Sequence, residues 1–102
     1  MSMGNLTSTQ RQYLRRLAHD LKPIAHIGKN GLTTPVVASV DTGLAARELI
    51  KVKFLDFQDQ KQALAQELAA ASHSELIGLI GNVAILYREH PDPQERQIAL
   101  PN

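Results

Sequence analysis

The 102-residue chain contains no cysteine and no tryptophan. Without cysteine, neither a disulfide framework nor a metal site built on thiolates can form. The sequence also has no apolar run of the ~20 residues that span a membrane, and no pattern typical of a cleaved signal sequence. We therefore expect a cytoplasmic protein with no membrane partner.

Sequence patterns of catalysis and metal binding are missing as well. The four histidines are scattered, without an i, i+4 pair and without a carboxylate at metal-ligand spacing. Neither a Gly-x-Ser-x-Gly elbow nor the glycine patterns of triphosphate-binding and dinucleotide-binding loops occur. We therefore expect no enzyme activity, no catalytic residue, no cofactor and no metal ion.

Periodicity and capping signals predict one domain over residues 1–102. Thr7 and Gln10 have the spacing of a capping box, and Gly81-Asn82 is a tight hairpin signal. Thr34 before Pro35 predicts the start of a second helix, and Asp56 or Asp59 the start of a third. The expected elements are a helix over 8–20, a strand over 24–27, a helix from 35, a strand over 49–55, a helix through about 72, and strands over 76–80 and 83–87.

This α-β-α-β-α-β-β order predicts an α/β protein of the two-layer α+β kind, with a single four-stranded mixed sheet packed with helices. In the second strand, Ile50, Val52 and Phe54 alternate with Lys51 and Lys53, so the two lysines share the other face of the sheet. Prolines interrupt residues 90–102. We expect this segment and residues 1–5 to be loosely ordered tails.

The Gly28-Lys29-Asn30-Gly31 segment carries the clearest functional signal. It lies between an expected strand and an expected helix, so it predicts a small cationic turn at a helix N-terminus. Free backbone N–H groups and the helix dipole favour anions at such a turn, and a nucleic-acid phosphate backbone fits this chemistry. The alternative is a plain strand-to-helix turn, which is a usual role of glycine.

The net charge of +1 hides an asymmetry along the chain. Residues 1–53 hold eight Lys or Arg and three Asp or Glu, whereas residues 54–102 hold three and seven. A basic face attracts a polyanion even when the whole chain is nearly neutral, but it can also be only a solvated surface. The basic candidates are Arg11, Arg15, His19 and Lys22 on one flank of the first helix, Lys51 and Lys53 on the second strand, and Arg88 after the last strand.

Aromatic residues are scarce, with two tyrosines and two phenylalanines in the chain. Proteins that read single-stranded nucleic acid usually stack bases on aromatic side chains. The composition therefore favours contact with the backbone and shape of a folded RNA.

Several segments, in this order and spacing, resemble the CRM-domain family, whose bacterial stand-alone members are the YhbY-like proteins. The resemblance covers about residues 6–101. It implies an RNA-binding domain similar to the C-terminal domain of translation initiation factor three, with a Gly-x-x-Gly loop like that of KH domains in a different topology. The matching runs are Leu21-Lys-Pro-Ile, Gly28-Lys-Asn-Gly-Leu-Thr, Glu48-Leu-Ile-Lys-Val-Lys, Ile80-Gly81, Leu86-Tyr87-Arg88 and Leu100-Pro101.

The resemblance also implies which residues contact RNA and what the RNA is. Ribosomal RNA in precursors of the large ribosomal subunit is the expected partner, with a role in ribosome assembly. We expect a monomer and no DNA partner. The alternatives are an adaptor that docks on a ribosomal protein or assembly factor and, more distantly, an enzyme of phosphorylated small molecules. The implied RNA contacts are the loop residues Gly28, Lys29, Asn30 and Gly31 and the basic residues Lys22, Lys51, Lys53 and Arg88.

Overall fold

A computed structural model describes residues 6–102, so the tail expected over residues 1–5 lies outside the described part. The elements follow the predicted order, with a short 3-10 turn before the third helix and another in the C-terminal segment. Their bounds are α1 (Ser8–Ala18), β1 (Ala25–Ile27), α2 (Thr34–Arg47), β2 (Leu49–Phe54), η2 (Gln58–Gln60), α3 (Lys61–Ala71), β3 (Glu75–Ile80), β4 (Val83–Tyr87) and η3 (Pro93–Glu95).

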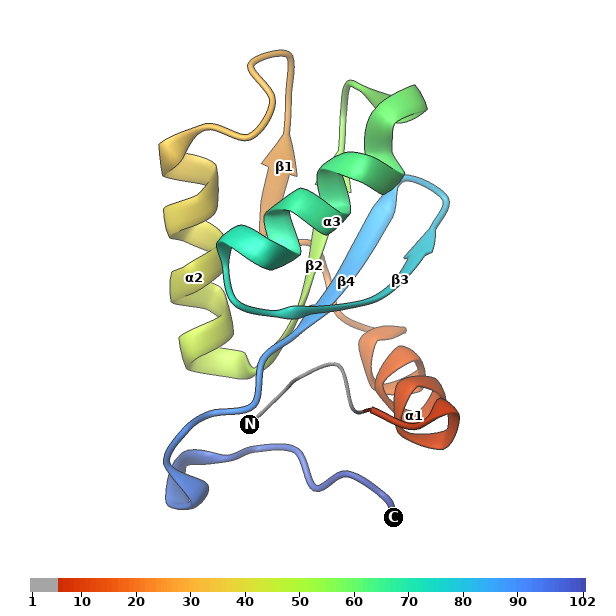
Figure 1. The fold of residues 1–102 in the computed structure, drawn as a ribbon, viewed down its shortest axis with the longest axis vertical. Helices are drawn as coiled ribbons and strands as arrows, with labels where there is room; N and C mark the ends of the chain where they lie inside the picture. Colours follow the sequence, from red (N-terminus) through yellow and green to blue (C-terminus); the bar gives the residue numbers. More distant parts are fainter. Residues whose placement is uncertain (1–5) are drawn as a thin grey trace.

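The four strands form one mixed sheet in the order β1-β2-β4-β3. Strands β1 and β2 are parallel, and β4 is antiparallel to both of its neighbours. Figure 1 shows α2 and α3 together on one face of this sheet, with α1 apart from them. The predicted α/β class and the single four-stranded mixed sheet are confirmed. None of the helices within residues 6–102 is long and apolar enough to cross a bilayer.

The two faces of the sheet bury separate apolar clusters. On one face Ile50, Val52 and Phe54 of β2 pack with Leu44 of α2 and Leu68 of α3, and together they form the larger part of the core. This is the two-layer arrangement that the sequence predicts, with alternate residues of a strand pointing to one side.

The opposite face is covered by α1. Leu14 and Ala18 of this helix pack on Leu49 of β2 and on Ile85 and Tyr87 of β4. Helix α1 therefore forms a further layer beside the two predicted ones. It lies on the face of the sheet that also carries the two lysines of β2.

The residue before β1, Ile24, packs closely on α2. A β-carbon at Gly43 would lie only 2.6 Å from Cδ1 of Ile24. This close approach explains a glycine in the middle of a helix, where it costs about 1 kcal/mol relative to alanine. It also fixes β1, and the loop that follows it, against α2.

Two predicted helix starts are displaced in the structure. Thr33, not Thr34, caps α2, and its hydroxyl accepts the backbone N–H of Val36 at 3.3 Å. Neither Asp56 nor Asp59 caps α3, which begins after the η2 turn without a side-chain cap. The Asp56 carboxylate instead accepts the N–H of the next residue, Phe57, at 2.7 Å.

The segment after β4 differs from the loosely ordered tail that the sequence predicts. Ile98 and Leu100 pack against the cluster beneath α1. The side-chain amide of Gln10 in α1 donates to the carbonyl of Pro101 at 2.9 Å. Prolines prevent this segment from forming a long helix or a strand, but they leave its apolar side chains available for packing.

Candidate nucleic-acid interface

Three connecting segments meet at one edge of the sheet. The Gly28–Gly31 turn follows β1, residues 55–60 follow β2, and the Gly81-Asn82 turn precedes β4 (Figure 1). Backbone hydrogen bonds join them, because Leu55 N–H donates to the Ile27 carbonyl at 2.8 Å and Phe54 N–H to the Asn82 carbonyl at 2.7 Å. The parallel pairing of β1 and β2 thus places the glycine turn beside the segment that leads into α3.

The glycine turn is closed by one backbone hydrogen bond. Gly31 N–H donates to the Gly28 carbonyl at 3.0 Å, and Gly31 has a φ of 69°, which only glycine adopts without strain. Lys29 and Asn30 lie at the exposed tip. Within residues 6–102 their own backbone N–H groups have no hydrogen-bond acceptor. The tip therefore presents two free amides to a ligand.

Neither the packing around Gly28 nor its backbone conformation requires a glycine at this position. A β-carbon at Gly28 would meet no atom within 4 Å, and the φ of Gly28 is not in the left-handed region. The absence of a side chain there leaves open space next to the free amides of the tip. A ligand backbone can approach most closely at such a position.

Helix α2 begins directly after the turn. It has 14 residues, and its first turn contains no acidic side chain. The partial positive charge of its N-terminus is therefore not neutralised locally. Together with the ammonium group of Lys29, this makes the turn attractive to an anion.

The cationic surface continues from the turn onto the sheet. Lys53 of β2 pairs in register with His26 of β1, which lies two residues before Gly28. Both side chains are exposed. The three ion pairs among the described residues involve neither Lys53 nor Lys29. Lys53 and Lys29 can therefore both meet a phosphate without breaking an ion pair.

The other basic residues on this side of the sheet differ in whether their side chains already have a hydrogen-bond partner. Lys51 Nζ donates to the carbonyl of His19 at 3.0 Å, at the end of α1, so this lysine already holds α1 on the sheet. Lys22, in the connection from α1 to β1, is exposed. Arg15 is also exposed, and its Cδ lies 3.6 Å from the place that a β-carbon on Gly78 of β3 would occupy.

Arg11 has a structural role at the opposite edge of the sheet. Its guanidinium pairs with the Glu75 carboxylate and donates to the Leu76 carbonyl at 3.1 Å, both at the start of β3. These partners lie more than 60 residues away in the sequence. The sequence alone gives no sign of them, and the structure does not bring Arg11 near the glycine turn.

Arg88 is likewise occupied. It follows β4 at the edge opposite the glycine turn, and it joins α2 to the end of α3. Its guanidinium donates to the Asp41 carboxylate at 2.7 Å and to the Ser72 carbonyl at 2.8 Å. The structure therefore groups Lys29 and Lys53 near the turn and leaves Arg11 and Arg88 apart from them.

Sequence reasoning missed one residue of this edge, Phe57. Its ring lies 3.7 Å from the position of a β-carbon on Gly31, so it packs beside the glycine turn. A single aromatic residue in the polar run between the second strand and the third helix was the available signal. Phe54, three residues earlier, is buried in the core.

Known proteins resemble this chain over most of its length. A Pseudomonas aeruginosa protein named "Probable RNA-binding protein PA4753" is 41% identical over 91 residues, covering 88% of each chain. The Bacillus subtilis "Probable RNA-binding protein YqeI" is 39% identical over 97 residues, covering 94% of this chain and 99% of its own. A Haemophilus influenzae protein named "RNA-binding protein" is 35% identical over 100 residues, covering 97% and 98%.

A solved structure and a family model agree with these relatives. The solution structure of a Staphylococcus aureus protein matches with a TM-score of 0.76 and 42% identity, covering 92% of this chain and 99% of that protein. The CRS1/YhbY (CRM) domain model matches residues 6–88, which include the glycine turn and the whole sheet. The chain belongs to the CRS1/YhbY (CRM) domain family.

Proposed function

We propose that this protein is a non-enzymatic RNA-binding protein that acts in the assembly of the large ribosomal subunit. The observation that carries the proposal is the Gly28–Gly31 turn, which has two free amides, an exposed lysine at Lys29 and open space beside Gly28, and which leads into the N-terminus of α2. Family membership and the names of the relatives support RNA as the ligand.

In this proposal the turn holds the phosphate backbone. The amides of Lys29 and Asn30 donate to phosphate oxygens, as backbone amides do in other anion-binding turns. Lys29 and Lys53 neutralise neighbouring phosphates, and Lys22 and Arg15 extend the contact along the α1 side. Arg11 and Arg88 support the fold instead, since their guanidinium groups already have partners.

A charge change at the turn tests this role. The Lys29→Glu, Asn30→Asp double variant should lose RNA affinity by tenfold or more while it keeps the melting temperature of the wild type. The control is Arg47→Glu with Gln66→Glu, which changes the net charge equally at exposed positions on α2 and α3. Fluorescence anisotropy with a labelled RNA measures both. Equal affinity of the two double variants would contradict the role of the turn.

Sedimentation of a cell lysate at two salt concentrations tests the ribosomal role. We expect the protein to migrate with precursors of the large subunit at low salt. It should be released at high salt, because phosphate contacts exchange for counterions. Migration as free protein at both salt concentrations would contradict this part of the proposal.

The alternative, a protein-binding adaptor, has one observation in its favour. Ile80 at the end of β3 is 61% exposed and Leu17 on α1 is 40% exposed. Apolar association would be little affected by salt. Co-migration that persists at high salt and is lost in the Ile80→Ser variant would favour the adaptor over RNA binding.

A further inference from the structure

Phe57 has a conformation that is costly for a residue with a side chain. Its φ of 57° and ψ of 35° are left-handed. A non-glycine residue in this region costs of order 1–3 kcal/mol and is held there by its surroundings. Here the Asp56 carboxylate accepts the Phe57 N–H at 2.7 Å, and the Phe57 carbonyl accepts the Gln60 N–H at 2.9 Å. The local bonds therefore fix the direction of the Phe57 side chain.

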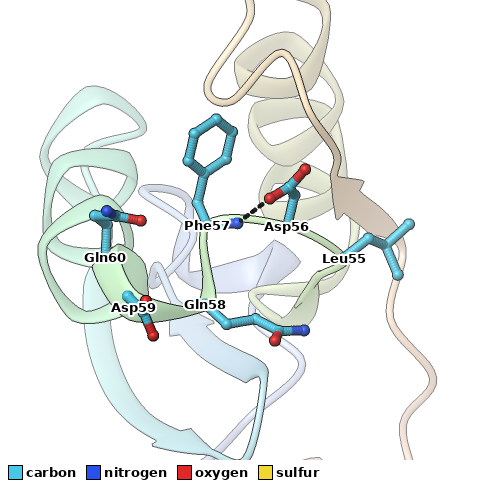
Figure 2. Close-up of a pocket in the computed structure, with 6 residues that line it drawn as sticks. All are labelled: Leu55, Asp56, Phe57, Gln58, Asp59 and Gln60. Carbon is cyan, nitrogen blue, oxygen red and sulfur yellow. Dashed lines mark hydrogen bonds between the residues drawn. The ribbon is translucent and has the colours of Figure 1, made fainter.

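This direction takes the ring out of the core and toward the glycine turn. Figure 2 shows the Phe57 ring standing out from its segment, on the side of the loop between β1 and α2. The residue is 36% exposed, and Cε2 lies 3.7 Å from the place of a β-carbon on Gly31. One part of the ring thus packs on the turn while another part is open to solvent.

Phe57 is the aromatic side chain best placed to meet a ligand at this edge. Phe54 and Tyr87 are buried, each with 1% exposure, and half-buried Tyr13 lies on α1. A nucleobase that reaches the glycine turn would find one aromatic surface there. The scarcity of aromatic residues therefore does not exclude base stacking at this position.

The charges around Phe57 favour a base over a phosphate. Residues 55–60 line a shallow hollow of about 300 Å³, and two of these residues, Asp56 and Asp59, are acidic. These carboxylates repel phosphates, but they can accept hydrogen bonds from the amino groups of a base. The adjacent glycine turn carries the opposite charge at Lys29. At this edge the glycine turn is thus suited to a phosphate, and the neighbouring hollow of residues 55–60 is suited to a base.

We propose that an unpaired nucleobase of single-stranded RNA stacks on Phe57 while the neighbouring phosphate lies on the Gly28–Gly31 turn. This inference rests on the proposed RNA-binding function and adds the form of RNA that is recognised. A base in a duplex is already paired and stacked, so it cannot use Phe57 without leaving its helix.

Substitution of Phe57 measures the contribution of the stack. The Phe57→Leu variant keeps an apolar side chain against Gly31 but removes the aromatic face. We expect it to bind an oligoadenylate of eight nucleotides roughly 5- to 150-fold more weakly, the range that follows from the loss of the aromatic platform under one stacked base. Binding to a duplex RNA of the same charge should be unchanged. Wild-type affinity for the oligoadenylate, or equal losses for both RNAs, would overturn the proposal.

A tryptophan at this position reports the stack directly. Because the chain has no tryptophan, Phe57→Trp introduces a single indole. We expect the oligoadenylate to quench its fluorescence and an abasic strand of the same length to leave it unchanged. The control, Gln94→Trp in the exposed η3 turn, should not respond to either strand. Quenching of Phe57→Trp by the abasic strand to the same extent, or no quenching by the oligoadenylate, would overturn the stack.

The two proposals fail in different ways. If the turn holds no phosphate, the Lys29→Glu, Asn30→Asp variant keeps its affinity for both the oligoadenylate and the duplex. If only the stack is wrong, that variant loses affinity for both RNAs and Phe57→Leu loses none.

Discussion

The carboxylate of Glu48 accepts the backbone N–H of Ile98 at 3.0 Å across 50 residues of sequence. It also accepts the N–H groups of Gln97 and His90, each at 2.7 Å. Glu48 is 1% exposed and has a φ of 64° between α2 and β2. A buried carboxylate normally needs several hydrogen bonds to offset its lost hydration, and here the C-terminal segment supplies them.

Replacement of this carboxylate should therefore loosen the C-terminal segment. In Glu48→Gln, the amide oxygen can still accept from Gln97 and Ile98, but the amide NH₂ faces the His90 N–H, so two donors meet. We expect the free energy of unfolding to fall by about 1–3 kcal/mol, the cost of a buried group left without its partner. Urea denaturation measures it. The exposed Glu67→Gln change in α3 is the control and should have little effect; equal stability of both variants would contradict the anchoring role.

The two glycines of the turn should respond differently to alanine. Gly31→Ala forces a β-carbon into a left-handed position and should lower the free energy of unfolding by about 1 kcal/mol. Gly28→Ala meets no atom and should leave stability unchanged within ~0.5 kcal/mol. If a phosphate backbone approaches Gly28, this second variant should nonetheless bind RNA more weakly. Thermal melts and anisotropy together separate the two effects, and full affinity in Gly28→Ala would argue against close approach there.

Substitutions of Arg88 and Lys53 should affect different properties: the first should lower stability and the second RNA affinity. Arg88→Ala removes hydrogen bonds to Asp41 and to the Ser72 carbonyl. It should lower the free energy of unfolding by about 1–2 kcal/mol, because one partner is charged but Asp41 is largely exposed. The RNA affinity of the folded protein should not change. A binding loss in Arg88→Ala at full stability would reverse this assignment.

Lys53→Met should show the opposite behaviour. Its melting temperature should match that of the wild type, and its RNA affinity should fall. The slope of log affinity against log salt should decrease by roughly 0.7–0.9, as expected when one phosphate contact is lost. An unchanged slope would show that Lys53 does not contact phosphate.

Ionisation of Tyr87 should lower the free energy of unfolding at alkaline pH. Its side chain is 1% exposed, and within residues 6–102 its hydroxyl has no hydrogen-bond partner. Burial, with smaller contributions from the charges of Glu89 and Glu48, raises the pKa of Tyr87 to about 12 from 10.0. The folded state therefore holds this proton more tightly than the unfolded state. The stabilisation is fully present below pH 10 and is lost as the pH rises from 10 to 12.

The Tyr87→Phe variant isolates this contribution. It removes a hydroxyl that is buried without a partner, so the free energy of unfolding at pH 7 should stay equal or rise by up to about 1 kcal/mol. Its stability should fall less steeply than that of the wild type between pH 10 and 12. Urea denaturation at pH 7, 10 and 11.5 measures both effects, and parallel slopes for the two proteins would contradict a raised pKa for Tyr87.

The sequence correctly predicted helices and strands that are marked by capping residues or by alternating apolar residues. The capping box of Thr7 and Gln10 is present at the start of α1. The alternation of Ile50, Val52 and Phe54 with two lysines correctly predicts that one face of β2 is buried in the core and that the other carries the lysines. Helix starts were less predictable. Thr33 and Thr34 offer equivalent hydroxyls, and the Asp56 carboxylate before α3 accepts a hydrogen bond from the local backbone instead of from a helix N-terminus.

The sequence placed the glycine turn, but it did not show which basic residues have acidic partners. The Gly28–Gly31 turn is a local motif, and the structure gives it the expected position between β1 and α2. The roles of Arg11 and Arg88 depend on Glu75 and Asp41, which are distant in sequence. A charge pattern shows where cations are, but not which of them already have acids beside them.

The sequence by itself determined the α/β element order, the face of β2 that carries lysines and the cationic glycine turn, because each depends on residues within a few positions of one another. Only the tertiary structure decided that the C-terminal segment closes on Glu48. It alone also decided that Arg11 pairs with Glu75, that Arg88 pairs with Asp41 and that Phe57 lies beside the turn. These relationships arise from chain segments brought together by the parallel and antiparallel pairing of the sheet, and no local pattern encodes them.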